Sequence, residues 1–427
     1  MSLPAQPCLI LAFLASTGAL PARQQPEPPP ASSRAETIEN ERTAKQATLT
    51  PEALPKPEQI LKQIQDERVL QRITEGYKGW RAIVGGLATG SGFALGAEYS
   101  YTNLGNGYME FHTAAQVSTR LWQKYSVSLL FPDSMGRRRN AVINFTHRNY
   151  NSLDYYGPGI HSTLGGRSNY RLEDSSLQAV NIMRPDKRLR AGFMAGYLWT
   201  NVGPGQRAGV ISSDHAFSEA LAPGIQRQSD FLRYGVTAQY DLRDNPLGPK
   251  SGGNYVLQWV RYKDQTRGLY SFNRYDIDFQ QYFGFFNNLR RIALRARGTF
   301  TDRVGSNVIP FYMRPTVGGS DDLRGYRQYR FNDPNSLVLN AEYRWEIFSG
   351  LDGALFYDAG KVMPRAGHLA LNQMKGAAGF GLRANLRNKT FMRFDVGFSR
   401  EGFMLWFKFN DAFNSTRFGT GAFQPLY

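Results

Sequence analysis

Apolar and polar side chains alternate along this chain from Trp80 to its end, and this period of two residues constrains the fold more than any other feature. In Leu337–Ile347 the odd-numbered residues are apolar or aromatic, and the even-numbered residues include Glu342 and Arg344. Successive side chains of a strand point to opposite faces, so each segment has one lipid-compatible face and one hydrated face. Such segments run for about nine to eleven residues, the length of a tilted transmembrane strand. The same pattern recurs in residues 232–243, 292–300 and 392–400.

A soluble antiparallel sandwich also has alternating strands, and two features favour a membrane barrel over it. The apolar faces carry many Tyr, Trp and Phe near the ends of the segments, as an interfacial girdle would. The polar faces carry several arginines, which a dry sandwich core would not bury. We therefore predict an all-β fold in which residues 80–427 form a transmembrane antiparallel β-barrel.

The composition does not fit a helical membrane protein. The mean hydropathy of −0.44 is too polar for transmembrane helices, and an aromatic content of 13% is too high for a disordered chain. Beyond the amino-terminal segment, no stretch approaches the roughly 18 uncharged apolar residues of a transmembrane helix. If the chain spans a membrane, its sheet must close, because an open edge leaves unpaired amides in lipid.

The amino-terminal residues are typical of a secretory signal. An apolar run, Leu9–Ala15, is followed by small residues that end near Ala19 or Ala22, so we expect residues 1–22 to be a signal peptide. No Lys or Arg precedes the run, which leaves the start of a buried helix as the alternative. Cys8, the only cysteine, lies within this segment, so the exported chain would carry no thiol.

Residues 23–79 are expected to precede the barrel as an extension of two parts. Residues 23–57 are rich in Pro, Ala, Glu and Gln and predict a disordered linker. Between Glu58 and Glu75 apolar residues recur at near-helical spacing among charges, which predicts one amphipathic helix. This helix is a candidate periplasmic handle, plug element or spacer, and we favour the spacer.

The formal net charge of +16 would suggest nucleic acid or an anionic surface as the partner of a soluble protein. Here the basic residues occur singly within the alternating segments. The one dense cluster, Arg137–Arg139, lies beside a turn at Pro132–Ser134. We therefore expect no nucleic-acid partner.

No motif indicates catalysis, a metal or a cofactor. The five histidines show no H-E-x-x-H or other paired ligand spacing, and no G-x-S-x-G motif is present. The glycine-rich segment Gly85–Gly92 lacks the Lys-Ser/Thr pair and the helix of a phosphate-binding loop. We expect that the chain is not an enzyme, with a lipase-like Ser/His pair formed in three dimensions as the remaining alternative.

The segment Gly318–Arg327 contains the tetrapeptide Leu323-Arg324-Gly325-Tyr326. It resembles the (V/L)-R-G-(F/Y) signature of the BamA/TamA, or bacterial surface antigen, superfamily of outer-membrane assembly factors. In that family the tetrapeptide lies at the tip of a long loop that folds back into the barrel lumen, where its arginine contacts acidic residues of the next two strands. The resemblance implies a barrel of about 16 strands in the bacterial outer membrane.

Two acidic residues lie where such an arginine would need them. Counting by twos from apolar neighbours puts Glu342 and Asp358 on the polar faces of two successive strands, independently of the family. A guanidinium between two carboxylates in a confined lumen forms charge-assisted bonds, which are stronger than neutral hydrogen bonds. We therefore expect Arg324 to pin the loop, and an exposed arginine in a turn is the alternative.

Further segments agree with the family in their order along the chain. Tyr240–Pro246 is similar to its D-x-R-D-N-P hairpin, and Tyr156–Gly159 resembles its F-x-G-x-G turn. The last strand, Arg400–Phe407, fits the polar-x-Gly-x-x-hydrophobic-x-aromatic signal by which assembly machinery recognises barrels. Its aromatic close can extend to Phe409 or Phe413, and the fourteen residues 414–427 follow Phe413, whereas such signals usually end the chain. We predict as signal residues Gly402, Leu405, Phe407, Phe409 and Phe413.

The resemblance covers Trp80–Phe413 and therefore supports the fold. Members that insert or secrete proteins usually carry POTRA domains ahead of the barrel. The segment between Ala22 and Trp80 has no room for one beside the linker and helix. We thus expect a short member that lacks POTRA domains, to which a POTRA-dependent function transfers poorly.

Two functions remain open at this point. In the first, the chain inserts or translocates proteins through a weak seam between its first strand, around Phe93–Tyr101, and its last strand, Phe403–Phe413, with Gly85–Gly92 as a flexible start. In the second, it is a channel whose lumen favours anions, with the Arg324 loop as a constriction. The basic residues predicted to line that lumen are Arg233, Arg243, Arg295, Arg297, Arg344 and Arg393.

A third idea is a barrel that exports or anchors a separately encoded partner through the amino-terminal helix. The expected partners are outer-membrane lipids, substrate proteins or periplasmic proteins that bind this helix, and the machinery that inserts the barrel itself.

Overall fold

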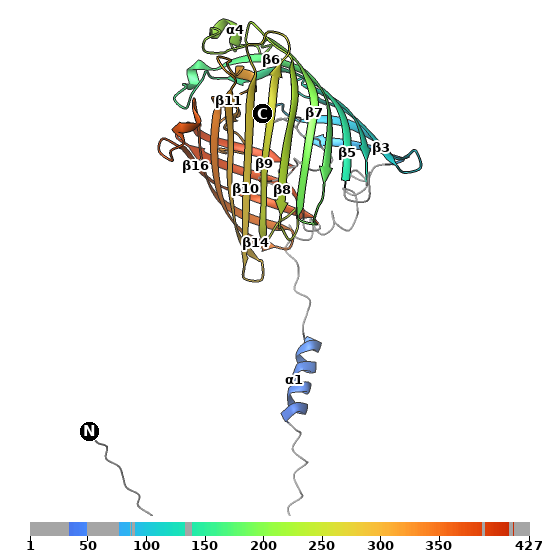
Figure 1. Cartoon of the computed structure of the whole chain (residues 1–427). Coiled ribbons are helices and arrows are strands. Elements are labelled where there is room, and N and C mark those ends of the chain that lie inside the picture. Colours follow the sequence, from blue (N-terminus) through green and yellow to red (C-terminus); the bar gives the residue numbers. More distant parts are fainter. Residues whose placement is uncertain are drawn as a thin grey trace, which may run out of the picture. The chain divides into compact units, whose positions relative to one another are not determined.

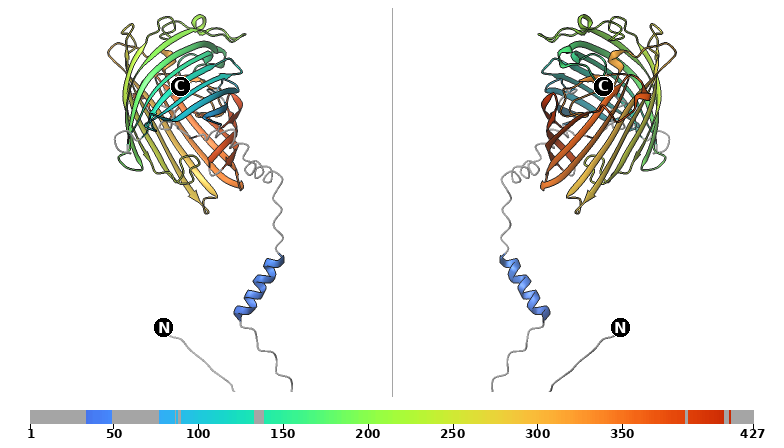
Figure 2. Two further views of the ribbon diagram at one scale, coloured as in Figure 1. Left: turned by 90° about the vertical axis from the view of Figure 1, so that its right-hand side faces the viewer. Right: turned by 90° about the vertical axis from the view of Figure 1, so that its left-hand side faces the viewer.

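One antiparallel sheet curls in sequence order into a barrel. The computed structural model describes residues 34–48, 77–85, 87, 90–132, 139–386, 389–409 and 413. Sixteen strands form the sheet, and each pairs with its neighbours along the chain except that β11 pairs with β14 (Figure 1). Both views of Figure 2 show the sheet curling until the blue amino-terminal strands approach the red carboxy-terminal strands.

The strands of this sheet are β1 (Trp80–Gly85), β2 (Ala94–Leu104), β3 (Met109–Ser118), β4 (Gln123–Phe131), β5 (Arg139–Tyr155), β6 (Ser168–Met183), β7 (Leu189–Pro204), β8 (Phe231–Asp241), β9 (Gly252–Asp264), β10 (Phe272–Phe285), β11 (Arg290–Arg303), β14 (Asn335–Phe348), β15 (Leu351–Met363), β16 (Lys375–Leu386), β17 (Lys389–Ser399) and β18 (Gly402–Lys408). Between β11 and β14, the short strands β12 (Thr316–Val317) and β13 (Phe331–Asn332) pair with each other. The loops also contain η1 (Leu164–Gly166), α4 (Ser213–Ala216), η2 (Phe311–Met313) and η3 (Ala366–His368).

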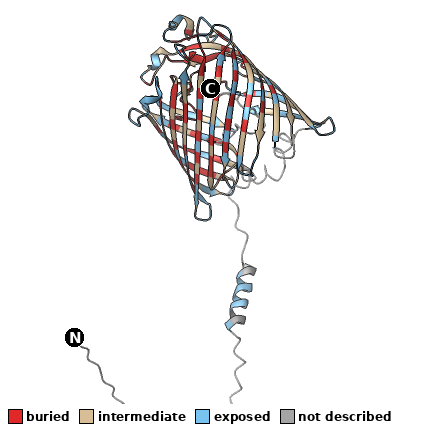
Figure 3. Ribbon diagram, in the orientation of Figure 1, coloured by how far each residue is buried: buried red, intermediate tan, exposed pale blue. Residues whose placement is uncertain are grey.

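The barrel has an apolar outside and a polar inside. On β8 every second residue is exposed, including Leu232, Tyr234 and Val236, whereas Arg233 and Thr237 between them are buried. Alternating bands of buried and exposed residues follow the strands around the wall (Figure 3). A soluble protein buries its apolar residues and exposes its polar ones. A barrel that faces lipid requires the reverse arrangement. The predicted all-β transmembrane antiparallel barrel with 16 strands is therefore confirmed.

The extension before the barrel differs in part from its prediction. Residues 34–48 form the helix α1 (Arg34–Thr48) inside the segment expected to be a disordered linker. The reason is local, because this stretch has no Pro or Gly and is rich in helix-forming Ala, Glu, Arg and Lys. No helix in the described ranges has the length and apolar character of a membrane span. The expected signal peptide, residues 1–22, and the expected helix over residues 58–75 lie outside the described residues.

The first strand also lies earlier than predicted. The expected first strand around Phe93–Tyr101 belongs to β2, and the first strand is the six-residue β1. The segment Gly85–Gly92 therefore joins β1 to β2 and does not begin the sheet. In β1 the three consecutive apolar residues Ala82–Val84 interrupt the alternation, so this strand is not set apart by its pattern. Among the described residues, β1 has a ladder with β2 alone and β18 has a ladder with β17 alone.

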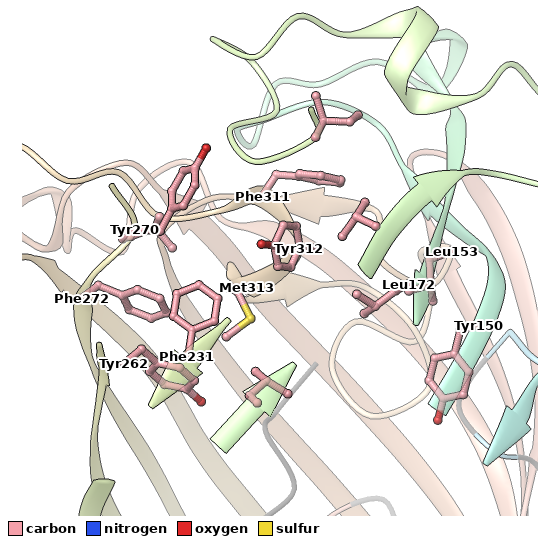
Figure 4. Close-up of a cluster of buried hydrophobic side chains, with 14 of the residues drawn as sticks. Tyr150, Leu153, Leu172, Phe231, Tyr262, Tyr270, Phe272, Phe311, Tyr312 and Met313 are labelled. Carbon is pink, nitrogen blue, oxygen red and sulfur yellow. The ribbon is translucent and has the colours of Figure 1, made fainter. Parts of the chain in front are cut away.

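Aromatic side chains from several loops pack together over one end of the barrel. Phe311, Tyr312 and Met313 of η2 lie at the centre of this cluster, at most 3% exposed, between Tyr270 and Phe272 on one side and strands β5 and β6 on the other (Figure 4). The contributing loops follow β3, β7, β9 and β11, so all of them lie at the same end of the sheet. Short turns connect the strands at the opposite end, as on the periplasmic side of outer-membrane barrels. We call this cluster the aromatic cap.

The lipid-facing assignment predicts a dependence on depth along β8. Val236 lies in the middle of the strand and Tyr240 near its periplasmic end, and both are exposed on the outer face. An arginine in place of Val236 would lie near the centre of the bilayer, so we expect Val236→Arg to lower the free energy of unfolding by about 2–4 kcal/mol. Tyr240→Arg is the matched control, with an expected loss of about 0–1 kcal/mol. Denaturant titration in lipid vesicles measures both, and equal losses would contradict the assignment.

A buried carboxyl group next to the cap predicts a pH dependence. Burial raises the pKa of Asp333 to about 6, although the nearby Arg314 guanidinium acts to lower it. The folded protein therefore holds this proton more tightly than the unfolded chain, and stability is gained as the pH falls from about 6 toward 4 and lost above 6. Relative to Asp333→Asn, we expect the wild-type barrel to have a higher unfolding midpoint at pH 5 than at pH 7. A difference between the two proteins that does not vary with pH would refute this.

Candidate functional site

The loop between β11 and β14, residues 304–334, folds back into the barrel, and its tip packs against the lumen wall. Leu323 and Tyr326 at the tip are 0% and 2% exposed and belong to a cluster with Val338 of β14. Gly325 lies so close to β17 that a Cβ atom there would come within 2.7 Å of the Phe398 carbonyl oxygen. The tip therefore fits against the wall only with glycine at this position.

Arg324 binds two strands at once. Its Nε and Nη2 atoms donate to the two carboxylate oxygens of Asp358 on β15, each at 2.8 Å, and its Nη1 donates to Glu342 Oε2 on β14 at 2.6 Å. The backbone N–H of Arg324 adds a hydrogen bond to Asp358 at 3.1 Å. The guanidinium also lies over the ring of Phe356, 3.4 Å from its centroid. This bidentate pairing fixes both the position and the orientation of the loop tip.

Further charges extend this contact across β14–β17. Glu342 also accepts hydrogen bonds from Arg344 at 2.6 Å and from Arg383 at 3.0 Å. Asp395 forms an ion pair with Arg383 at 2.7 Å and accepts a hydrogen bond from Arg393 at 2.7 Å, and Arg393 also donates to Asp321 in the loop at 2.6 Å. We call this set of four arginines and four carboxylates the lumen ion network: Arg324, Arg344, Arg383, Arg393, Asp321, Glu342, Asp358 and Asp395.

The lumen ion network is electrically balanced and almost entirely buried. Its formal charges cancel, and apart from Asp321 the side chains are at most 2% exposed. Burying a charge is tolerated only where partners and hydrogen bonds compensate the lost hydration. Each charged side chain of the network therefore keeps its buried position only while its oppositely charged partners remain beside it. Over the described ranges, no group of three or more His, Cys, Asp or Glu side chains is arranged to hold a metal ion.

The structure brings together the six residues predicted to lock the loop, which are Leu323, Arg324, Gly325, Tyr326, Glu342 and Asp358. Sequence reasoning missed Arg383 and Asp395. The signal that could have found them is the same alternation, because Arg383 lies between outward-facing Leu382 and Ala384, and Asp395 lies two residues after the predicted inward residue Arg393.

Most of the predicted basic residues of the lumen have acidic partners. Arg295 pairs with Asp278 at 2.6 Å, Arg297 pairs with Asp322, and Arg344 and Arg393 belong to the lumen ion network. Arg233 is 2% exposed and donates to Ser176 at 2.7 Å. Arg243 does not lie on a strand, which corrects its prediction. It follows the end of β8, in the turn whose Asn-Pro sequence ends the strand, and pairs with Asp241 at 2.8 Å.

The predicted signal residues of the last strand divide into two groups. Leu405, Phe407 and Phe409 are 57%, 54% and 37% exposed on the outer face, and Gly402 begins β18 with a φ of +111°. Phe413 does not continue this strand, which ends at Lys408. It is 1% exposed and packs inside the barrel with Tyr282 and Ala293. The alternation that turns Leu405, Phe407 and Phe409 outward therefore does not extend to Phe413, which faces the interior.

Sixteen antiparallel strands, apolar outside and charged inside, with a long loop bound to the lumen wall, define an outer-membrane β-barrel protein of the kind that carries an internal loop. Residues 91–402 match the family model described as the Omp85 superfamily domain. The chain belongs to this superfamily, whose members assemble or translocate proteins at the outer membrane, and it is a protein of the Gram-negative outer membrane.

Solved structures agree with the fold. The barrel is similar to BamA from Haemophilus ducreyi lacking POTRA domains 1–3, with a TM-score of 0.58 and 14% identity over 78% of this chain and 69% of that one. It is also similar to CdiB from Escherichia coli, with a TM-score of 0.51 and 12% identity over 78% of this chain and 62% of that one. The chain thus spans less than two thirds of CdiB. No curated protein matches the sequence.

The pairing of Arg324 predicts a large effect of its removal. Arg324→Ala leaves Glu342 and Asp358 buried with fewer cationic partners, and we expect a loss of about 3–5 kcal/mol of stability. On an unheated gel this appears as loss of the compact folded band at temperatures that the wild-type barrel withstands. Arg327→Ala removes an exposed arginine from the same loop and is the control. An unchanged folded band for Arg324→Ala would contradict a role of this residue in holding the loop.

Proposed function

We propose that this barrel assists the insertion or translocation of proteins at the outer membrane through the edges of β1 and β18. The observation that carries the proposal is that each of these strands has a ladder on one side only among the described residues. They are also short, with six and seven residues. An edge strand offers backbone N–H and C=O groups to a further strand, so a client protein in extended form can pair with it.

A steady open pore fits the structure less well. The aromatic cap packs over one end of the barrel, and the loop tip with the lumen ion network fills the lumen beside β14–β17. The arginines that would favour anions are largely paired with carboxylates, so their field is mostly cancelled. The anion-favouring channel is therefore the second candidate. The Arg324 loop would be its constriction.

The partners follow from the same surfaces. Outer-membrane lipids cover the exposed apolar face, of which Val236 and Leu257 are examples. Substrate proteins would meet the two edges. The outward residues Leu405 and Phe407 together with Gly402 form the segment by which assembly machinery would recognise this barrel during its own insertion. We propose that the extension before the barrel, residues 23–79, is a spacer, with contact to periplasmic proteins as its alternative role, and that the barrel itself performs no catalytic step.

Assisted folding tests the proposal directly. Lipid vesicles that contain the purified barrel are mixed with a urea-unfolded eight-stranded outer-membrane protein, and its folded fraction is followed by gel mobility. We expect folding several-fold faster than in vesicles that contain an equal amount of a closed porin, because only the proposed protein offers open edges. Equal rates in the two vesicle preparations would contradict the proposal.

Conductance separates the two candidate functions. In planar bilayers we expect small, flickering currents from the wild-type barrel, because the cap and the loop occupy its lumen. A large and steady anion-selective current would favour the channel instead. Arg327→Ala is the control for the wild-type currents, because it alters an exposed residue of the loop and leaves the lumen ion network intact.

A further inference from the structure

The two edges of the sheet are held to the rest of the barrel in very different ways. Their ladders are nearly equal, because β1 shares six residue pairs with β2 and β18 shares seven with β17. If the ladders alone held them, both strands would open with similar free energies. The difference between them lies in contacts with the interior.

The strand β18 is bound to the internal loop before it begins and within its length. Glu401, next to the start of the strand, accepts hydrogen bonds from Arg330 Nε at 2.9 and 3.0 Å. Arg330 is 2% exposed and also donates to the hydroxyl and carbonyl of Ser162, at 2.8 and 2.6 Å. Further along, the indole N–H of Trp406 donates to the carbonyl oxygen of Arg324 at 2.7 Å.

The neighbouring strand and the chain beyond β18 reinforce this attachment. Ser399 of β17 donates to the carbonyl oxygen of Gly325 at 2.7 Å. The loop tip lies so close to β17 that a Cβ atom on Gly397 would come within 2.4 Å of the Arg324 carbonyl oxygen. Beyond the strand, Phe413 is buried against Tyr282. The last hairpin is therefore fixed at its tip, along its length and after its end.

Contacts of β1 are of another kind. Apart from its ladder, the described residues record for β1 an ion pair from Arg81 to Glu98 and a ring contact from Trp80 to Tyr99, and both partners lie on β2. Two backbone hydrogen bonds also join Trp80 to Tyr77 in the turn that precedes the strand. The side chain of Arg81 is 46% exposed, so its ion pair contributes little to stability. Among the described residues, no hydrogen bond, ion pair or ring contact joins β1 to the internal loop.

From this asymmetry we infer that β18 is the fixed edge of the seam and β1 the moving edge, and that Trp406 is a positioning residue that holds β18 on the internal loop. The inference rests on the proposed function, for which it names the strand that moves when the seam admits a client. The loop tip is itself bound to β14 and β15 through Arg324, so it provides a rigid support for β18.

Trp406 suits this role because its position leaves the indole N–H few alternative hydrogen-bond acceptors. Its side chain points inward between the outward-facing Leu405 and Phe407. The side chain is half-buried, and the backbone carbonyl of Arg324 supplies an acceptor for its N–H. Phenylalanine at this position would keep the ring in the lumen and lose only the donor.

Hydrogen–deuterium exchange of the full-length protein in lipid nanodiscs tests the inference, because local opening of a strand sets the exchange of its ladder amides. In the wild-type protein we expect the ladder amides of β18 to exchange at least fivefold more slowly than those of β1, the factor that roughly one additional hydrogen bond contributes. Equal exchange of the two strands, or slower exchange of β1, would overturn the inference. This comparison needs no variant.

Variants then test Trp406 itself. Trp406→Phe is expected to raise the exchange of β18 about fivefold and to leave β14 and β15 unchanged. Glu401→Gln weakens the contact with Arg330 and is expected to act in the same direction. Phe403→Leu changes an outward-facing aromatic residue of the same strand that is not among the predicted signal residues, and it is the control, with no expected effect. A general rise across β14–β18 in Trp406→Phe, or no rise in either of the first two variants, would reject a positioning role.

The exchange experiment tests the fixed edge and the vesicle assay tests the proposed function, so either idea can be refuted without the other. If β18 is protected and β1 is not, but the barrel does not accelerate folding of the eight-stranded client, the proposed function is wrong and the fixed edge stands. If the barrel accelerates folding but both edges exchange alike, the proposed function stands and the fixed edge is wrong.

Discussion

The structure depends on the pairing of Arg324 with Asp358 and Glu342 inside the barrel. None of these charges is stable in a packed lumen without the others, so the loop tip, β14 and β15 determine one another's positions. Arg383 and Arg393 extend the same constraint to β16 and β17 through Asp395. The loop and the carboxy-terminal strands thus behave as one rigid unit, although the loop contributes no strand to the main sheet.

The lumen consequently has two unlike halves. Beside the loop, Arg383 and Asp395 have side chains that are 0% exposed. On the first strands, the inward-facing Glu98 and His112 are 21% and 27% exposed, and their charged contacts lie within β1–β3. The sheet therefore ends in a packed half at β18 and in a hydrated half at β1. A function that uses the edges will treat these two ends differently.

Much of this was predictable from the sequence, because alternation with a period of two residues is a local property. It gave the barrel, the inward faces of Glu342 and Asp358, and the outward faces of Leu405 and Phe407. The resemblance to the BamA/TamA superfamily then identified Arg324 as the partner of these two carboxylates. The same alternation puts Arg383 and Asp395 on inward faces, but it cannot show which strands meet inside the lumen, so their part in the lumen ion network and the inward place of Phe413 were missed. Strand β1 was missed because its apolar run Ala82–Val84 interrupts the alternation, and helix α1 was missed because the prolines around it predict disorder.

The order of the residues in the lumen ion network also has a consequence for how the polypeptide reaches its native state. The strands whose charged side chains bind Arg324 and its carboxylate partners follow it along the chain, from β14 to β17, and β18 binds its carbonyl oxygen. The tip of the loop can reach its native position only after these strands have entered the bilayer, and until then its arginine must remain in water. Biogenesis should therefore conclude with a cooperative step, in which a largely assembled wall acquires its internal support all at once.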